Sequence, residues 1–128
     1  MVGESLIGSD QISVLVVDDQ PPFRKVAATV VSLVPGWQVV AEADSGEEAV
    51  SRTLEARPDV VLMDINLPGI NGIDATRQIL AQRPETVVLL LSTYDAADLP
   101  ADAMSCGARA YVRKEDLTPR VLRELLAG

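Results

Sequence analysis

The chain has 128 residues, of which 48% are hydrophobic and 3% aromatic, and its formal net charge is −8. This length suffices for one domain with an aliphatic core, and the apolar content excludes an intrinsically disordered chain. A chain this acidic is a poor binder of nucleic acids or anionic membranes by itself, so a cation site or a basic partner surface is favoured.

Several residue types and segments are missing, and their absence narrows the function. There is no histidine, which excludes histidine general bases, histidine metal ligands and Ser-His-Asp triads. Cys106 is the only cysteine, so no internal disulfide is expected, in keeping with a reducing cytoplasm. No apolar run approaches the length of a membrane span. Residues 1–10 lack the pattern of a signal peptide and are expected to form a flexible tail before a single domain at 11–128.

Short apolar runs alternate with segments of helical periodicity along the chain. The runs predict strands at 12–17, 37–43, 60–63, 86–91 and 110–112. The periodic segments predict helices at about 23–34, 46–56, 73–82, 98–106 and from 119 onwards. Pro100 is expected in the first turn of the fourth helix, where it is tolerated but shortens the helix. Five such repeats predict an α/β fold, with a parallel sheet, helices on both faces and right-handed crossovers.

Polar residues follow the carboxyl ends of four predicted strands. They are Asp18 and Asp19 after the first strand, Asp64 after the third, Ser92 after the fourth and Lys114 after the fifth. Ligands of open parallel sheets bind outside these strand ends, at the point where the strand order reverses. We therefore expect three carboxylates, a hydroxyl and an ammonium group to meet at one edge of the sheet.

Such a cluster suits a hard cation and a phosphorylated ligand. Mg²⁺ takes oxygen ligands and combines one or two carboxylates with phosphate oxygens and water. Asp19 and Asp64 are expected to ligate it directly and Asp18 through water, while Asn66 offers a backbone carbonyl. Lys114 and the Ser92 hydroxyl would contact phosphoryl oxygens. The reaction that fits best is attack by an aspartate oxygen on phosphorus.

Four stretches in this order resemble the receiver domain of two-component response regulators. They are Val-Val-Asp-Asp at 16–19, Met-Asp-Ile-Asn-Leu-Pro-Gly-Ile-Asn-Gly at 63–72, Leu-Ser-Thr at 91–93 and Gly-Ala-Arg-Ala-Tyr-Val-Arg-Lys at 107–114. The resemblance covers about residues 13–128. It implies a flavodoxin-like (CheY-like) sheet with strand order 2-1-3-4-5 and a signalling switch rather than an enzyme, although such domains assist their own phosphorylation and dephosphorylation.

The resemblance also implies roles for individual residues. Asp64 would accept a phosphoryl group from a histidine kinase, with Mg²⁺ held by Asp18, Asp19, Asp64 and Asn66. Phosphate binding and switching would fall to Ser92, Thr93, Tyr111 and Lys114. Phosphorylation-dependent homodimers are the expected assembly.

The sequence departs from many receivers after the conserved lysine position, where Glu115 replaces a proline. A cis bond before a residue other than proline costs about 2.5–4 kcal/mol, so we expect a trans peptide there. Lys114-Glu115-Asp116 resembles the subfamily with a LuxR-type C-terminal DNA-binding domain. That domain lies outside this chain, which is expected to be either a stand-alone receiver or the receiver part of a longer regulator, and we favour the second.

Two other functions remain as alternatives. A phosphatase of the haloacid dehalogenase type also uses an aspartyl nucleophile and Mg²⁺, but it needs a second acid where this chain has Asn66, and it needs room for a cap domain. A pseudo-receiver would be a pure interaction module, and that interpretation requires a broken site, whereas every expected position here is filled.

Overall fold

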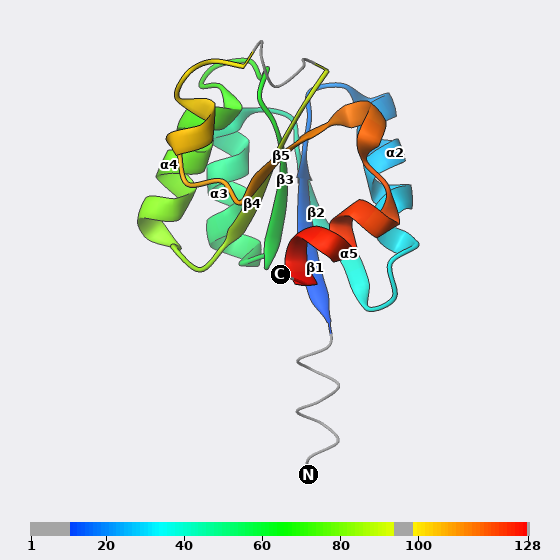
Figure 1. The fold of residues 1–128 in the computed structure, drawn as a ribbon. Coiled ribbons are helices and arrows are strands. Elements are labelled where there is room, and N and C mark those ends of the chain that lie inside the picture. Colours follow the sequence, from blue (N-terminus) through cyan, green and yellow to red (C-terminus); the bar gives the residue numbers. More distant parts are fainter. Residues whose placement is uncertain (1–10, 94–98, 128) are drawn as a thin grey trace.

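The computed structural model describes residues 11–93 and 99–127, which form a five-stranded sheet with helices on both faces (Figure 1). The strands are β1 (Ile12–Val17), β2 (Trp37–Ala43), β3 (Val60–Asp64), β4 (Val87–Ser92) and β5 (Ala110–Arg113). The α-helices are α2 (Pro21–Ser32), α3 (Gly46–Ala56), α4 (Gly72–Gln82) and α5 (Pro119–Ala127). The expected tail at 1–10 and the start of the fourth predicted helix lie outside the described residues.

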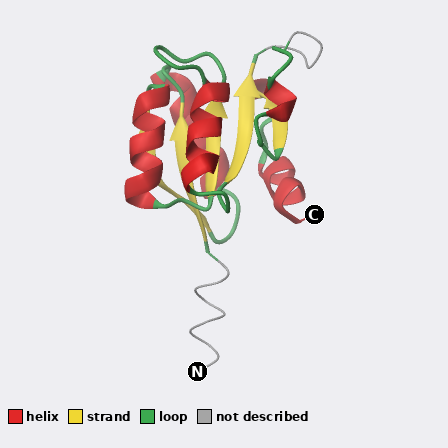
Figure 2. Cartoon of the chain, turned by 90° about the vertical axis from the view of Figure 1, so that its left-hand side faces the viewer, coloured by secondary structure: helices red, strands yellow, loops and turns green. Residues whose placement is uncertain are grey.

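The sheet has the order β2-β1-β3-β4-β5, and every neighbouring pair is parallel, so the expected fold is confirmed. The arrows in Figure 2 accordingly run in one direction. Helices α3 and α4 cover one face and α2 and α5 the other (Figure 1). The two faces carry separate apolar clusters. β3 is buried along its whole length because its side chains belong alternately to one cluster and the other.

Local chemistry explains where the helices begin. Ser45 and Asn71 are N-caps whose side chains accept hydrogen bonds from the backbone amides of Glu48 and Asp74, at 3.1 and 2.8 Å. Helix α2 instead begins at Pro21, two residues before the predicted start, because prolines are tolerated in a first turn whose amides have no partner within the helix.

The prediction of a fourth long helix at 98–106 was wrong for the residues that the structure describes. Residues 99–106 contain only a 3₁₀ turn, Ala103–Ser105. The backbone amide of Ala103 donates to the Pro100 carbonyl at 3.0 Å, which is a bond of the i to i+3 type. Ala103 and Cys106, three residues apart, are the buried side chains of this segment, and residues at this spacing lie on one side of a 3₁₀ turn.

The peptide bond after Lys114 and the length of the helices can also be compared with the sequence analysis. The Lys114–Glu115 peptide is trans, as expected, because no described peptide bond is cis. None of the helices in the described part of the chain has the length and hydropathy needed to cross a lipid bilayer.

Candidate functional site

Three carboxylates meet at the carboxyl edge of the sheet, as the strand order predicts. Asp18 and Asp19 follow β1, and Asp64 is the last residue of the adjacent strand β3. Each offers one oxygen such that all three oxygens lie within 4.8 Å of one another. Asp18 and Asp64 are buried, whereas Asp19 is exposed, so the cluster is open to solvent on the side of Asp19.

The residues that follow β1 fix the orientation of Asp18. Its Oδ1 accepts a hydrogen bond from the backbone amide of Gln20 at 2.8 Å. Its backbone carbonyl accepts one from Nη1 of Arg24 at 2.7 Å, and Arg24 also forms an ion pair with Glu42 at 3.0 Å. Asp18 is thus held from both ends and has little freedom to swing toward a ligand.

Lys114 supplies the positive charge of the site, directly after β5. Its Nζ lies 2.6 Å from Oδ2 of Asp18 and 3.4 Å from Oδ2 of Asp64. Only 12% of its side chain is exposed. The ammonium group is therefore closer to Asp18 than to Asp64 and partly neutralises both carboxylates.

An open cavity of about 200 Å³ lies over this cluster. It is lined by residues from the ends of four strands, namely Asp19, Gln20, Asp64, Asn66, Thr93 and Lys114. The backbone amide of Asn66 donates to Oδ1 of Asp64 at 3.2 Å, which orients the carboxylate in the cavity. The space suffices for a phosphoryl group that approaches Asp64 from solvent.

Three of the residues singled out from the sequence, Asp18, Ser92 and Tyr111, do not line this cavity. Ser92 ends β4 beside Arg113 of β5 and is fully buried, and Thr93 is the hydroxyl residue that faces the cavity. Tyr111 is half-buried on β5 and lines a separate hollow with Val121 and Leu125 of α5.

The pKa of Asp64 is raised from 3.8 to about 6, chiefly by burial and secondly by the like charge of Asp18. The Lys114 ammonium acts in the opposite direction and lowers this pKa. At neutral pH Asp64 therefore lowers the free energy of unfolding, because its carboxylate is charged there and the folded environment disfavours the charged form.

The raised pKa makes stability depend on pH in a defined window. Between about pH 4 and pH 6 the folded state binds more protons at Asp64 than the unfolded chain does, so this group lowers the free energy of unfolding as pH rises. Without divalent cations, Asp64→Asn should therefore be more stable than the wild type at neutral pH, by up to about 3 kcal/mol. At about pH 4 the difference should vanish.

Urea unfolding in a chelator at both pH values measures this difference. Asp116→Asn, a substitution of an exposed carboxylate, is the control and should leave stability unchanged at both. A wild type that is more stable than Asp64→Asn at neutral pH would show that the site does not strain the carboxylate.

The donor set fits a hard divalent cation. Three carboxylate oxygens converge, and the second charge next to Asp64 raises its pKa, so a bound cation would relieve the repulsion. Asp18 Oδ2 is buried and accepts no well-aligned hydrogen bond within the described residues, although the Lys114 ammonium lies close to it. The groups that would hold the cation directly are the carboxylates of Asp19 and Asp64 and the backbone carbonyl of Asn66. Asp18 would contact it through a water molecule.

Three residues that contact the site were not predicted from the sequence to belong to it. Gln20 and Arg24 hold Asp18, and the ring of Phe23 lies 4.6 Å from the Lys114 ammonium. Phe23 was assigned to the apolar face of its helix, and it does pack against the cluster on that face of the sheet. Its second contact depends on how the first turn of α2 lies beside the segment that follows β5, which helical periodicity does not reveal.

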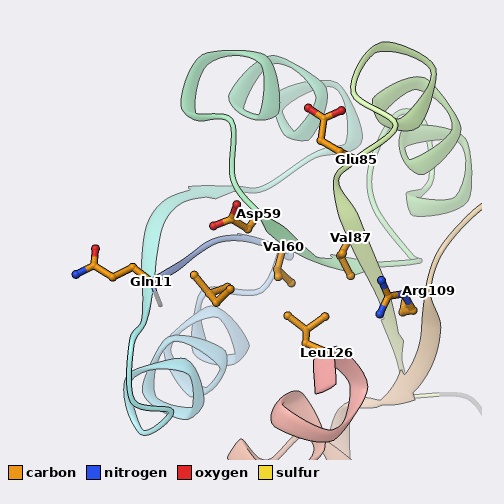
Figure 3. A pocket seen from close by; sticks show the side chains of 8 residues that line it. Gln11, Asp59, Val60, Glu85, Val87, Arg109 and Leu126 are labelled. Atoms are coloured by element: carbon orange, nitrogen blue, oxygen red, sulfur yellow. The ribbon is translucent and has the colours of Figure 1, made fainter. Parts of the chain in front are cut away.

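A larger hollow, of about 470 Å³, lies at the opposite, amino edge of the sheet (Figure 3). Its apolar lining includes Val60, Val87 and Leu126. The Arg109 guanidinium there donates to the Leu125 carbonyl, and Asp59 accepts from Ser13, so these charged groups serve the fold. The acidic cluster therefore remains the candidate site.

Comparisons with known proteins agree with this geometry. The family model for the response regulator receiver domain matches residues 14–127. The chain is 35% identical over 109 residues to the transcriptional regulatory protein DegU of Brevibacillus brevis, covering 85% of this chain and 46% of that protein. It is 40% identical over 103 residues to the response regulator GacA of Pseudomonas viridiflava, covering 80% of this chain and 48% of that protein. The chain thus spans about half the length of these curated relatives.

A solved structure extends the comparison to the fold. The crystal structure of a LuxR-family two-component response regulator from Aurantimonas sp. SI85-9A1 aligns with a TM-score of 0.81 and 30% identity, covering 91% of this chain and 86% of that chain. This similarity agrees with the LuxR-type subfamily that residues 114–116 indicate. Because the family match runs from β1 to α5, this chain belongs to the receiver domains of response regulators, the phosphorylation-dependent switches of two-component systems.

Proposed function

We propose that Asp64 is the phosphoacceptor of this receiver domain and takes its phosphoryl group from a histidine kinase. The observation that carries the proposal is the position of the Asp64 carboxylate, which lies in an open cavity, 3.4 Å from the Lys114 ammonium and beside two further aspartates. Asp18 is engaged by Gln20, Arg24 and Lys114, so it is poorly placed to act as a nucleophile.

The proposed step is a direct displacement at phosphorus. An oxygen of Asp64 forms the new O–P bond while the N–P bond to the donor imidazole breaks, and the imidazole nitrogen keeps the electron pair. Lys114 neutralises negative charge on the phosphoryl oxygens, and Thr93 lines the cavity that they would occupy. A cation held by Asp19, Asp64 and the Asn66 carbonyl, with Asp18 behind them, would stabilise the remaining oxygens.

The wider role is proposed from the relatives. DegU is named a transcriptional regulatory protein, and the chain spans about half of it, so we propose that this domain controls a DNA-binding output domain in a longer cytoplasmic regulator. DNA would then be contacted only by that output domain, in keeping with the net charge of −8. In this proposal the domain contacts no membrane, and it catalyses only its own phosphorylation and dephosphorylation.

Two measurements together separate the receiver from both alternatives. The protein is incubated with acetyl phosphate and Mg²⁺ and its intact mass is measured, and a receiver should gain one phosphoryl group. A phosphatase would instead release phosphate continuously from a chromogenic phosphate ester. A pseudo-receiver would neither gain mass nor release phosphate, and either result would refute the proposal.

We expect phosphorylation to promote a homodimer. Helix α5 buries Leu122 completely and leaves Val121 and Leu125 only partly covered, beside the hollow at Tyr111, so an apolar surface is available for pairing. Light scattering with and without beryllofluoride, which mimics a bound phosphoryl group, measures the mass. Leu125→Lys should keep the activated protein monomeric, whereas Leu33→Lys, on an exposed residue after α2, should not. An unchanged mass in the activated wild type would refute the dimer.

We expect the hydroxyl of Ser92, at the end of β4, to couple phosphorylation to Tyr111. A phosphoryl group on Asp64 offers a charge-assisted hydrogen bond to the Ser92 hydroxyl, which would draw in the following loop and let Tyr111 turn inward. Ser92→Ala should therefore still be phosphorylated but show a weakened NMR response of Tyr111 to beryllofluoride.

Thr93→Ala is the matched control for Ser92→Ala, because Thr93 is the neighbouring hydroxyl that lines the cavity. If Thr93→Ala weakens the response and Ser92→Ala leaves it intact, the coupling runs through Thr93 instead.

A further inference from the structure

The Lys114 ammonium has an aromatic contact in addition to its two carboxylates. Its Nζ lies over the ring of Phe23, 4.6 Å from the ring centroid. The same nitrogen lies 2.6 Å from Asp18 and 3.4 Å from Asp64, and its side chain is 12% exposed. Cation–π contacts are strongest where the cation is shielded from water, so this ring contributes to the position of the ammonium.

Phe23 is itself firmly placed. It lies in the first turn of α2, where Pro21 and Pro22 fix the backbone, and its amide donates to the Gln20 carbonyl at 3.1 Å. Its half-buried ring packs against the apolar cluster between α2, α5 and the sheet. The adjacent Arg24 donates to the backbone carbonyl of Asp18, so one helical turn contacts both Lys114 and the backbone of Asp18.

We infer that Phe23 is a positioning residue for phosphorylation, whose ring holds the Lys114 ammonium beside Asp64. The inference rests on the proposed function, in which Asp64 accepts the phosphoryl group and Lys114 neutralises it. Without the ring, the flexible lysine side chain gains rotamers and can leave the site for solvent. An aliphatic residue of similar size would preserve the packing of α2 and lose the attraction to the cation.

The test compares Phe23→Leu with Phe23→Tyr in labelling by acetyl phosphate and Mg²⁺. We expect Phe23→Leu to slow labelling by about 2- to 30-fold and Phe23→Tyr to stay near the wild-type rate. Trp37→Leu is the matched control, because Trp37 is half-buried against the same cluster but begins β2, at the opposite edge of the sheet. It should label at the wild-type rate.

An NMR measurement reports the contact itself. The ring should shift the ε-methylene protons of Lys114 upfield in the wild type and in Phe23→Tyr, and Phe23→Leu should return them to ordinary values. In a Lys114→Gln background, Phe23→Leu should cause no further loss of rate, whereas a purely structural role of the ring would slow both backgrounds equally.

The outcomes distinguish the two proposals. A wild type that is not labelled refutes the phosphoacceptor itself. A labelled wild type with an equally fast Phe23→Leu and unshifted Lys114 signals refutes only the role of Phe23. Equal losses of rate in Phe23→Leu and Phe23→Tyr also refute it, because the ring would then act by packing alone.

Discussion

Asp64→Asn is expected to accept no phosphoryl group from acetyl phosphate or from a histidine kinase, a loss on the order of a thousandfold or more in rate. The amide cannot attack phosphorus as a carboxylate does. The substitution preserves the side-chain size at a position that is 4% exposed, and it removes a carboxylate whose pKa is raised by burial. The variant should therefore remain folded, and intact-mass measurement over time should show no added phosphoryl group.

Two controls make this result specific. Asp116→Asn changes an exposed carboxylate two residues after Lys114 and should label at the wild-type rate. A thermal melt of Asp64→Asn should show cooperative unfolding at or above the wild-type midpoint. Labelling of a folded Asp64→Asn at the wild-type rate would place the phosphoryl group on another residue.

The sheet could be predicted because its strands carry strong local signals. β1 and β2 have the predicted bounds, and the others differ by a single residue at their ends. β1, β3 and β4 are short runs of mainly β-branched or aliphatic residues, and β3, which is covered on both faces, has no polar residue before Asp64. The ligand edge then follows from parallel topology, and this is why Asp18, Asp19, Asp64 and Lys114 meet as expected.

The segment after β4 could not be predicted in the same way. Its alanines favour helix in isolation, but Pro100 has no amide to donate, and the only buried side chains at 99–106 are those of Ala103 and Cys106. Two small buried residues provide little apolar area to hold a long helix against the sheet, so packing overrides the local preference. The result is the 3₁₀ turn Ala103–Ser105.

The contacts within the site also needed the structure. Sequence spacing places Lys114 at the correct edge, but the preference of its ammonium for Asp18 over Asp64 depends on side-chain directions in three dimensions. The same holds for Phe23, Gln20 and Arg24, which contact the site only because the first turn of α2 folds back over the end of β1. Local periodicity reports which face of α2 is apolar and not which residues lie beyond the sheet edge.

Removal of divalent cations is expected to reduce labelling of Asp64 to background. Without a cation, an incoming phosphate meets Asp18, Asp19 and Asp64 with only the charge of Lys114 to offset them, and Lys114 is already engaged by Asp18. Excess chelator should therefore abolish labelling by acetyl phosphate, and added Mg²⁺ should restore it. The metal-free protein should stay folded, since Asp18 and Asp64 accept hydrogen bonds from the backbone amides of Gln20 and Asn66. Labelling that persists in excess chelator would show that Lys114 alone suffices.

The variants Asp19→Ala and Asp18→Ala separate direct from indirect cation contacts. Asp19 is exposed and lines the cavity with Asp64 and Asn66, whereas Asp18 is buried and already engaged by Gln20 and Lys114. Asp18→Ala should therefore raise the Mg²⁺ concentration needed for half-maximal labelling by about 10- to 100-fold, as for an outer-shell partner, and Asp19→Ala should raise it more because it removes a direct ligand. Asp18→Ala should also release the Lys114 ammonium, which the ε-methylene signals of Lys114 report. A larger Mg²⁺ requirement in Asp18→Ala than in Asp19→Ala would assign the direct contact to the buried carboxylate.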